Sequence, residues 1–313
     1  TRFKCDWSSD VCSSDLIGGV TIELWSNNNG APGNRISSVT SRVSGKTKGL
    51  WLLAGDFVIN TSYFLIETDP NGYLSTGACG TVAGASPACA VVQGGISIVP
   101  VAGNTNQLRV NYGSGGSATN VQFLDALPAT ISGAVYNDQN GNGKIDSGKQ
   151  SIDYLIGGGS TAVTAYRDNG DGVFSATTDT VATPATSNPD AVTGDTSAAT
   201  SLSGEGQWSI SGLAPGTYFV VQTGRPNNVS WGSTGAIKGG ACGSGCSITV
   251  EAVDRFRVVV ASGSVASGNQ FLDQTGDLAI SSMSDGTDVV IAGASTTYTL
   301  RITNVGNGTA ASG

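Results

Sequence analysis

The sequence predicts an all-β protein built from tandem β-sandwich modules, of which the third is truncated. Three observations support this prediction. The 313 residues include 46 Gly, and Asp outnumbers Glu by 19 to 4, which favours turns and strands over helices. Long stretches of sequence recur within the chain. No segment keeps the 3.6-residue period of an amphipathic helix over the length that a helix needs.

The first 16 residues are predicted not to belong to the fold. The string from Asp6 to Leu16 resembles a sequencing adapter translated in frame, so residues 1–16 are interpreted as an assembly artefact. A genuine disordered leader is the alternative. Setting this segment aside removes Cys5 and Cys12 and leaves four cysteines. On this interpretation the true N-terminus is missing from the sequence.

An internal repeat organises the rest of the chain. Residues 107–125 align without gaps to residues 255–273, with nine identical positions that include the closing Gln-Phe-Leu-Asp. Two shorter matches place Val20–Trp25 opposite Ala162–Arg167, and Ala54–Val58 opposite Pro215–Phe219. The chain therefore contains two copies of one module.

Each copy is predicted to consist of strands and turns. Val20, Ile22 and Leu24 alternate with polar neighbours, which is typical of a strand with one buried face. Residues 218–221 are apolar on both faces and follow a Pro-Gly turn, as expected of an interior strand. Short β-branched runs at 248–250 and 257–260 add further strands.

The repeat sets the predicted module boundaries. The first module spans residues 17–125 and lacks its opening strand, and a linker at 126–130 leads into the second module at 131–273. Residues 277–313 give two strands, too few for a sandwich core, so a third domain is predicted to be cut short.

The sharpest chemical motif follows the strand that ends at Tyr136. Counting Asp138 as position 1, oxygen-bearing side chains stand at positions 1, 3, 5 and 9, and Gly143 stands at position 6. This is the spacing of an EF-hand calcium loop, in which the carbonyl of position 7 is also a ligand. The predicted ligands are Asp138, Asn140, Asn142, Lys144 (through its carbonyl) and Asp146.

The motif departs from the EF-hand pattern at position 12, where Lys149 replaces the bidentate Glu. A weak calcium site is therefore expected, with a dissociation constant of about 0.1–1 mM, as in extracellular modules. Asp153 or a neighbouring loop would complete the ligand set. The alternative is a turn-rich hairpin without a metal, because Asn and Gly both favour positive φ.

Other acidic residues leave their roles open. Asp168, Asp171 and Asp179 form a second acidic loop, where calcium ligands and ordinary turn residues are equally compatible with the pattern. The repeated Asp125 and Asp273 could reach an ion between domains, although a strand-end Asp exposed to water is the preferred interpretation.

The four remaining cysteines are predicted to form two local disulfides, Cys79–Cys89 and Cys242–Cys246. Each pair follows a Ser-Thr-Gly-Ala segment in a Gly-rich region, so the pairs occupy comparable places in the two modules. Disulfides imply an oxidising compartment. A Cys-x3-Cys half-site for a metal is the rival interpretation, but no His and no second pair complete four ligands in either module.

The composition argues against several classes of function. The absence of His excludes Ser-His-Asp and Cys-His catalysis and His-ligated metal sites. The formal net charge of -8 disfavours nucleic acids and anionic membrane surfaces as partners. No run approaches the ~18 apolar residues of a membrane span. The chain is predicted not to be an enzyme.

Two segments carry a resemblance to known families. Residues 131–146 together with Leu213–Tyr218 resemble the B repeat of the serine-aspartate repeat surface proteins, over all of the second module and most of the first. Residues 277–304 resemble the start of a conserved tandem-repeat β domain of bacterial surface proteins. The resemblance implies Ig-like or prealbumin-like β-sandwich modules, calcium as the bound ion, and a place outside the cell, either on the bacterial surface or secreted.

The function predicted from this resemblance is structural: a stalk segment of an adhesin, stiffened by calcium and local disulfides. Its partners would be the neighbouring repeats of the same chain, and a host or matrix protein or a glycan bound elsewhere. The alternative is a carbohydrate-binding or spacer module of an extracellular enzyme, with aromatic side chains stacked on sugars. The aromatic candidates are Trp25, Trp51, Trp208 and Trp231.

Overall fold

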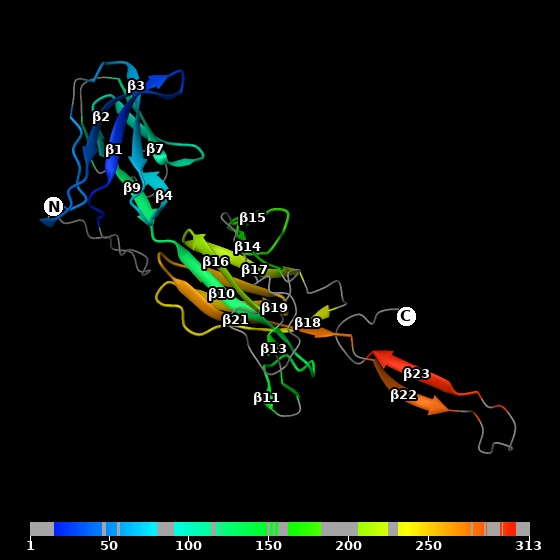
Figure 1. Ribbon diagram of the computed structural model, residues 1–313. Helices are drawn as coiled ribbons and strands as arrows, with labels where there is room; N and C mark the ends of the chain where they lie inside the picture. Colours follow the sequence, from blue (N-terminus) through cyan, green and yellow to red (C-terminus); the bar gives the residue numbers. More distant parts are fainter. Residues whose placement is uncertain are drawn as a thin grey trace. The chain divides into compact units, whose positions relative to one another are not determined.

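The computed structural model describes residues 16–45, 48–54, 57–79, 91–113, 117–119, 121–148, 151–152, 154–155, 162–182, 206–224, 231–276, 278–284, 286, 295 and 297–304. Throughout this part of the chain the regular structure is β-strand, and no α-helix occurs (Figure 1). The described residues include no helix with the length and apolar composition that a membrane crossing requires. The predicted artefact lies almost entirely outside the described residues.

The chain divides into two compact units, residues 1–128 (unit 1) and 129–313 (unit 2), and each is described separately. Unit 1 contains an antiparallel five-stranded sheet in the order β2-β1-β3-β7-β6. Its strands are β1 (Thr21–Asn28), β2 (Ala31–Thr40), β3 (Thr61–Thr68), β6 (Ile96–Val101) and β7 (Asn104–Tyr112). The remaining strands form two short pairs, β4 (Leu74–Cys79) with β9 (Gln122–Ala126), and β5 (Val91–Gln93) with β8 (Ser117–Thr119).

The core of unit 1 lies on one face of its large sheet. The expected alternation is present in β1, where Ile22 and Leu24 are buried while their neighbours are not. Leu65 in β3 and Leu108 in β7 join them in the same apolar cluster. Phe123 of β9 packs against that cluster, so the β4–β9 pair covers the buried face of the sheet.

Unit 2 contains two larger sheets. In the first, β10 (Ala129–Asn137) pairs with β21 (Val265–Thr275) on one edge, and β21 pairs with β18 (Trp231–Ile237). The other edge of β10 is shared by β16 (Gln207–Leu213) and β13 (Tyr154–Leu155). The second sheet has the order β15-β14-β17-β20-β19. Its strands are β14 (Ala162–Arg167), β15 (Thr180–Val181), β17 (Gly216–Gly224), β19 (Ser247–Ala252) and β20 (Arg255–Val260).

The two sheets of unit 2 pack face to face. One apolar cluster combines Trp208 and Phe271 from the first sheet with Val220 and Phe256 from the second. The rings of Phe256 and Phe271 meet with centroids 4.7 Å apart, and the ring of Trp208 lies 5.9 Å from that of Phe271. The prediction of an all-β, sandwich-like fold is confirmed at this level, and β17 is the interior strand expected from its doubly apolar sequence.

The first and last strands of this sandwich, β10 and β21, run parallel to each other. Their ladder is interrupted between Ile131 and Gly133, where fully buried Asn269 donates its amide to the carbonyls of Ser132 and Ala266. Gly133 is required at this point, because a Cβ there would lie 1.7 Å from the carbonyl oxygen of Asn269. A side-chain amide thus replaces the missing ladder bonds.

The structure corrects two of the predicted repeat matches. In β14 the buried residues are Val163 and Ala165, so Ile22 of unit 1 corresponds to Val163 and the predicted alignment is displaced by one residue. Such a shift exchanges the buried and exposed faces of a strand. The match of residues 54–58 to 215–219 is also wrong, because β3 begins at Thr61. The 107–125 and 255–273 match is confirmed by pairing, since Leu65 faces Leu108 as Val220 faces Phe256.

The connection between the two units is shorter than predicted. Ala126 still belongs to β9, and β10 already begins at Ala129, which leaves Leu127 and Pro128 between the strands. At the other end of the described chain, β22 (Leu278–Ser284) and β23 (Thr299–Asn304) form an antiparallel hairpin, which matches the two strands expected there. A further small pair, β11 (Ser147–Gly148) with β12 (Ser151–Ile152), precedes β13.

Candidate metal centres

The predicted calcium loop follows β10 directly and is organised around the carboxylate of Asp138. This side chain is completely buried, and its two oxygens accept hydrogen bonds from the backbone N–H groups of Asn142 (3.2 Å) and Gly143 (2.8 Å). Gly143 has φ of 71°, the left-handed conformation expected at position 6 of such a loop. The backbone N–H of Asp138 donates to the carbonyl of Asp273 in β21, which fixes the loop to the sheet.

The remaining predicted ligands lie together on the same loop. The side-chain amides of Asn140 and Asn142 both donate to Oδ2 of Asp146, over 2.8 and 2.6 Å. Oδ1 of Asn142 accepts the backbone N–H of Lys144. The side chains of Asn140, Asn142 and Asp146 are therefore hydrogen-bonded to one another, while the carboxylate of Asp138 binds backbone N–H groups of the same loop. The donor set is made of oxygen atoms and suits a hard cation such as Ca²⁺. Lys149 and Asp153 lie outside the described residues.

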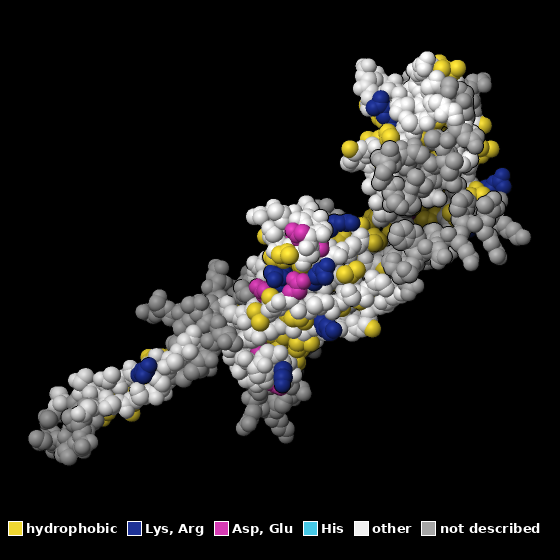
Figure 2. All heavy atoms as spheres, turned by 180° about the vertical axis from the view of Figure 1, so that it is seen from behind, with side chains coloured by type: hydrophobic (Ala, Val, Ile, Leu, Met, Phe, Trp, Pro, Cys, Tyr) yellow, Lys and Arg dark blue, Asp and Glu magenta, His cyan; other side chains and the backbone are white. Residues whose placement is uncertain are grey.

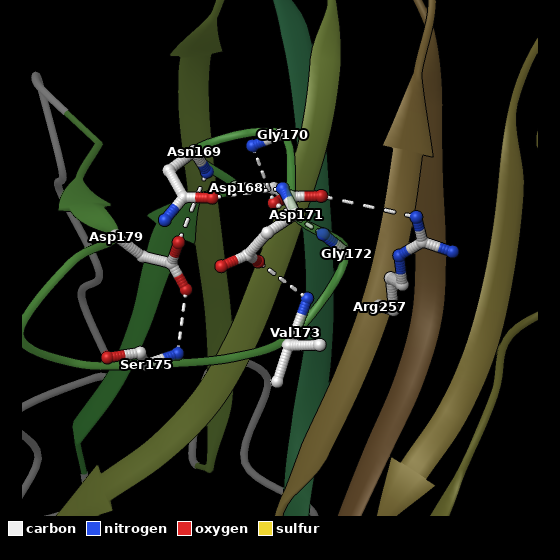
Figure 3. A network of polar contacts seen from close by, with 9 residues as sticks. All are labelled: Asp168, Asn169, Gly170, Asp171, Gly172, Val173, Ser175, Asp179 and Arg257. Atoms are coloured by element: carbon white, nitrogen blue, oxygen red, sulfur yellow. Dashed lines mark hydrogen bonds and ion pairs between the residues drawn. The ribbon is translucent and has the colours of Figure 1, made fainter.

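The second acidic loop connects β14 to β15 in unit 2 (Figure 3). Asp168, Asp171 and Asp179 each place a carboxylate oxygen within 4.8 Å of the others. Asp179 is buried and Asp171 is exposed. Seven residues lie between Asp171 and Asp179 in the sequence, and the loop folds back so that the carboxylates of all three acids come together.

The carboxylates of this loop already satisfy backbone groups. Oδ1 of Asp168 accepts the N–H groups of Gly170 (2.9 Å) and Gly172 (3.1 Å), and its Oδ2 lies 4.0 Å from a guanidinium nitrogen of Arg257. Asp179 accepts the N–H groups of Asn169 and Ser175, as Figure 3 shows. Asp168 and Asp179 therefore act as turn residues, because their carboxylates accept backbone N–H groups of the loop. The three carboxylates could also hold a metal ion.

Replacing Asp179 with Ala is expected to destabilise unit 2 by about 1–3 kcal/mol, because it removes the acceptor of two backbone N–H groups at a buried position. Asp171→Ala is the matched control, since this exposed carboxylate accepts only the backbone N–H of Val173 among the bonds drawn in Figure 3. Urea unfolding in EDTA measures both changes. Equal losses in the two variants would contradict a structural role specific to Asp179.

A third acidic cluster, in unit 1, was not predicted as a site. Glu67 of β3, Asp69 just after it, and Asp125 of β9 place carboxylate oxygens within 4.8 Å of one another. Burial and the nearby carboxylate of Asp125 raise the pKa of Glu67 to about 8. Burial also raises the pKa of Asp125. Of these three residues the sequence interpretation singled out only Asp125, because no local motif links Glu67 to it.

The preferred interpretation of Asp273 as a water-exposed strand end is wrong. Asp273 is fully buried and accepts hydrogen bonds from the side-chain amide of Gln222 and the hydroxyl of Ser233 (3.1 Å). Asp125, at the equivalent place in unit 1, is partly buried. The closing Asp of each repeat is at least partly buried because its strand, β9 in unit 1 and β21 in unit 2, packs on the core.

The four Trp candidates for sugar stacking are partly or fully occupied in packing. Trp208 is 2% exposed within the core of unit 2, and Trp231 packs against the same cluster. Trp51 packs against the core of unit 1. Trp25 is half-buried in β1 and donates its indole N–H to Glu23, which also pairs with Arg35. These contacts favour structural roles.

Cys242 and Cys246 form the predicted local disulfide between β18 and β19, with Cα atoms 5.5 Å apart. Both cysteines pack against the core of unit 2. The predicted Cys79–Cys89 pair lies outside what the structure describes, because Cys89 is not among the described residues.

On the face of unit 2 shown in Figure 2, acidic side chains lie next to basic ones. Elsewhere in the same unit, Arg257 and Asp168 show an acid–base pair at 4.0 Å.

Comparisons with protein-family models, with curated proteins and with solved structures found no match to this chain.

Proposed function

We propose that this chain is a structural stalk segment of a bacterial surface or secreted adhesin, in which calcium orders acidic loops of repeated β units. The observation that supports this most directly is the fixed geometry of the Asp138 loop. Its turn is held in place by backbone hydrogen bonds to a buried carboxylate. A preorganised oxygen-rich loop costs less free energy to order when calcium binds.

The repeat supports the same proposal. The two units share strand order and register through β1, β3, β7 and β6 in unit 1 and β14, β17, β20 and β19 in unit 2. Only Leu127 and Pro128 separate the last strand of unit 1 from the first strand of unit 2. Tandem copies of one unit joined by a short Pro-containing connection are well suited to act as spacers.

Calcium is expected to raise the melting temperature of unit 2. A site with a dissociation constant near 0.5 mM adds about 2 kcal/mol at 10 mM calcium, or roughly 5 °C for a unit of this size. Asp146→Asn removes a charged ligand with little change in shape and is expected to remove the part of the shift that the Asp138 loop contributes. Asp254→Asn, an acid outside both loops, is the control and is expected to keep it.

Differential scanning calorimetry of the full chain, in calcium and in EDTA, measures these shifts. The transition of unit 2 is identified by the Asp179→Ala variant, which lowers it selectively. An unchanged melting temperature of unit 2 in calcium contradicts the proposed role of the Asp138 loop. The spacer role itself is tested by small-angle scattering, where calcium is expected to increase the maximum dimension of the full chain, and a decrease would contradict it.

A further inference from the structure

The two units carry different polar side chains at one equivalent position, next to the Asp that closes each repeat. Strand register makes Glu67 of unit 1 equivalent to Gln222 of unit 2, because Ile22 faces Glu67 as Val163 faces Gln222. It also makes the Ser75–Asp125 pair equivalent to the Ser233–Asp273 pair. Each unit therefore holds three polar side chains at corresponding places.

In unit 2 these side chains form a hydrogen-bonded set. Gln222, which is 4% exposed, and Ser233 both donate to the buried carboxylate of Asp273. Two donors face one negative charge, so the carboxylate is compensated within the protein. No additional ligand is needed to bury it.

In unit 1 the amide donor is replaced by another acid. Glu67 is only 5% exposed, and its Oε2 is buried with no hydrogen-bond partner among the described residues. Oδ1 of Asp125, Oδ1 of Asp69 and the hydroxyl of Ser75 are likewise buried without a partner there. Asp69 adds a third carboxylate, where unit 2 has Gly224 at the corresponding place.

The position of Glu67 shows that this carboxylate is directed inward. Tyr63 and Leu65 precede it at alternate positions of β3, and all three residues are buried. Side chains two residues apart share one face of a strand, so Glu67 continues the core-facing row. Its carboxylate reaches those of Asp69 and Asp125 at the end of that row, within 4.8 Å.

We propose that Glu67, Asp69 and Asp125 bind one calcium ion in unit 1, with the hydroxyl of Ser75 as a further oxygen ligand. Three carboxylates and a hydroxyl form a hard, all-oxygen donor set, which is the chemistry that Ca²⁺ selects. In unit 1 the ion offsets the negative charge of the carboxylates. In unit 2 the hydrogen bonds from Gln222 and Ser233 have that effect on Asp273. This site shares no residue with the Asp138 loop, so it stands independently of the proposed function.

The test is the number of calcium ions bound per full-length chain, measured by equilibrium dialysis with ⁴⁵Ca²⁺ at pH 8 and saturating calcium. Glu67→Gln is expected to lower that number by one, and Asp69→Asn is expected to weaken binding at the same site by at least tenfold. Glu67→Gln reproduces the unit 2 arrangement, in which the amide can donate to the neighbouring Asp, so the variant is expected to fold normally. Its melting temperature in EDTA verifies this.

Asp146→Asn provides the matched comparison, because it removes only the unit 2 loop site. The losses in Asp146→Asn and Glu67→Gln are expected to be additive in the double variant. If Glu67→Gln binds as many calcium ions as the wild type, the proposal is overturned, and the carboxyl groups of unit 1 are then held together by a shared proton alone. That result would leave the function proposed for the Asp138 loop unaffected.

Discussion

Replacing Gln222 with Glu is expected to destabilise unit 2 by about 3–5 kcal/mol at pH 8, because it removes a hydrogen-bond donor from a buried charge and places a second charge beside it. The wild-type amide donates to Asp273, a carboxylate with no exposed surface. An introduced carboxylate would repel that charge and remove one of its two donors. In unit 2 no third acid corresponds to Asp69, so a cation is held less well there than in unit 1.

The loss in Gln222→Glu is expected to shrink as the pH falls. An introduced carboxyl that takes up a proton can donate it to Asp273 and restore the lost hydrogen bond. Urea unfolding of the full chain at pH 5 and pH 8, followed through the unit 2 transition, measures the difference. Gln207→Glu is the control, because Gln207 is exposed in β16 of the same unit. If both variants lose equal stability at pH 8, the Gln222–Asp273 hydrogen bond does not make the predicted contribution to the stability of unit 2.

The stability of unit 1 in EDTA is expected to fall by up to about 3 kcal/mol between pH 5 and pH 8, because the coupled carboxyl groups of Glu67 and Asp125 hold protons in the folded unit. The pKa of Glu67 is raised from 4.5 to about 8 in the folded state. The folded unit therefore binds the proton more tightly than the unfolded chain. This contribution is fully present below pH 4.5 and is lost as the pH rises through about 8. The raised pKa of Asp125 acts in the same direction.

The comparison of wild type with Glu67→Gln reports the titration of Glu67 together with its coupling to Asp125 and Asp69, because removing one carboxyl also changes the pKa of its neighbours. The stability gained by the substitution is expected to grow from pH 5 to pH 8 in EDTA and to diminish when calcium is added. Guanidinium unfolding at several pH values provides the measurement. A gain that is independent of pH would show that Glu67 titrates normally in the folded unit.

Several strands could be predicted from the sequence because period-2 patterns and turn residues act locally. The interior strand β17 and the opening strand β10 are examples, with Val220 and Val135 buried as their patterns require. Gly143 could be predicted at its turn because a positive φ is a property of one residue and its neighbours.

The third acidic cluster could not be predicted because it depends on register between distant strands. The predicted alignment of the β1 and β14 segments was displaced by one residue, and the match around β3 was displaced further. Because of these errors, the predicted alignment did not place Glu67 opposite Gln222. The comparison of Asp125 with Asp273 was correct, yet the inward direction of Asp273 follows only from the pairing of β21 with both β10 and β18.

The parallel pairing of β10 with β21 has a mechanical consequence. The chain enters the sandwich of unit 2 at Ala129 and leaves it at Thr275, at opposite ends of two adjacent parallel strands. A pull on the two ends loads the hydrogen bonds of this pair in shear, so they must yield together and cannot open one at a time. Asn269, which bridges the interruption in the ladder, adds a side-chain hydrogen bond between the two strands at that point.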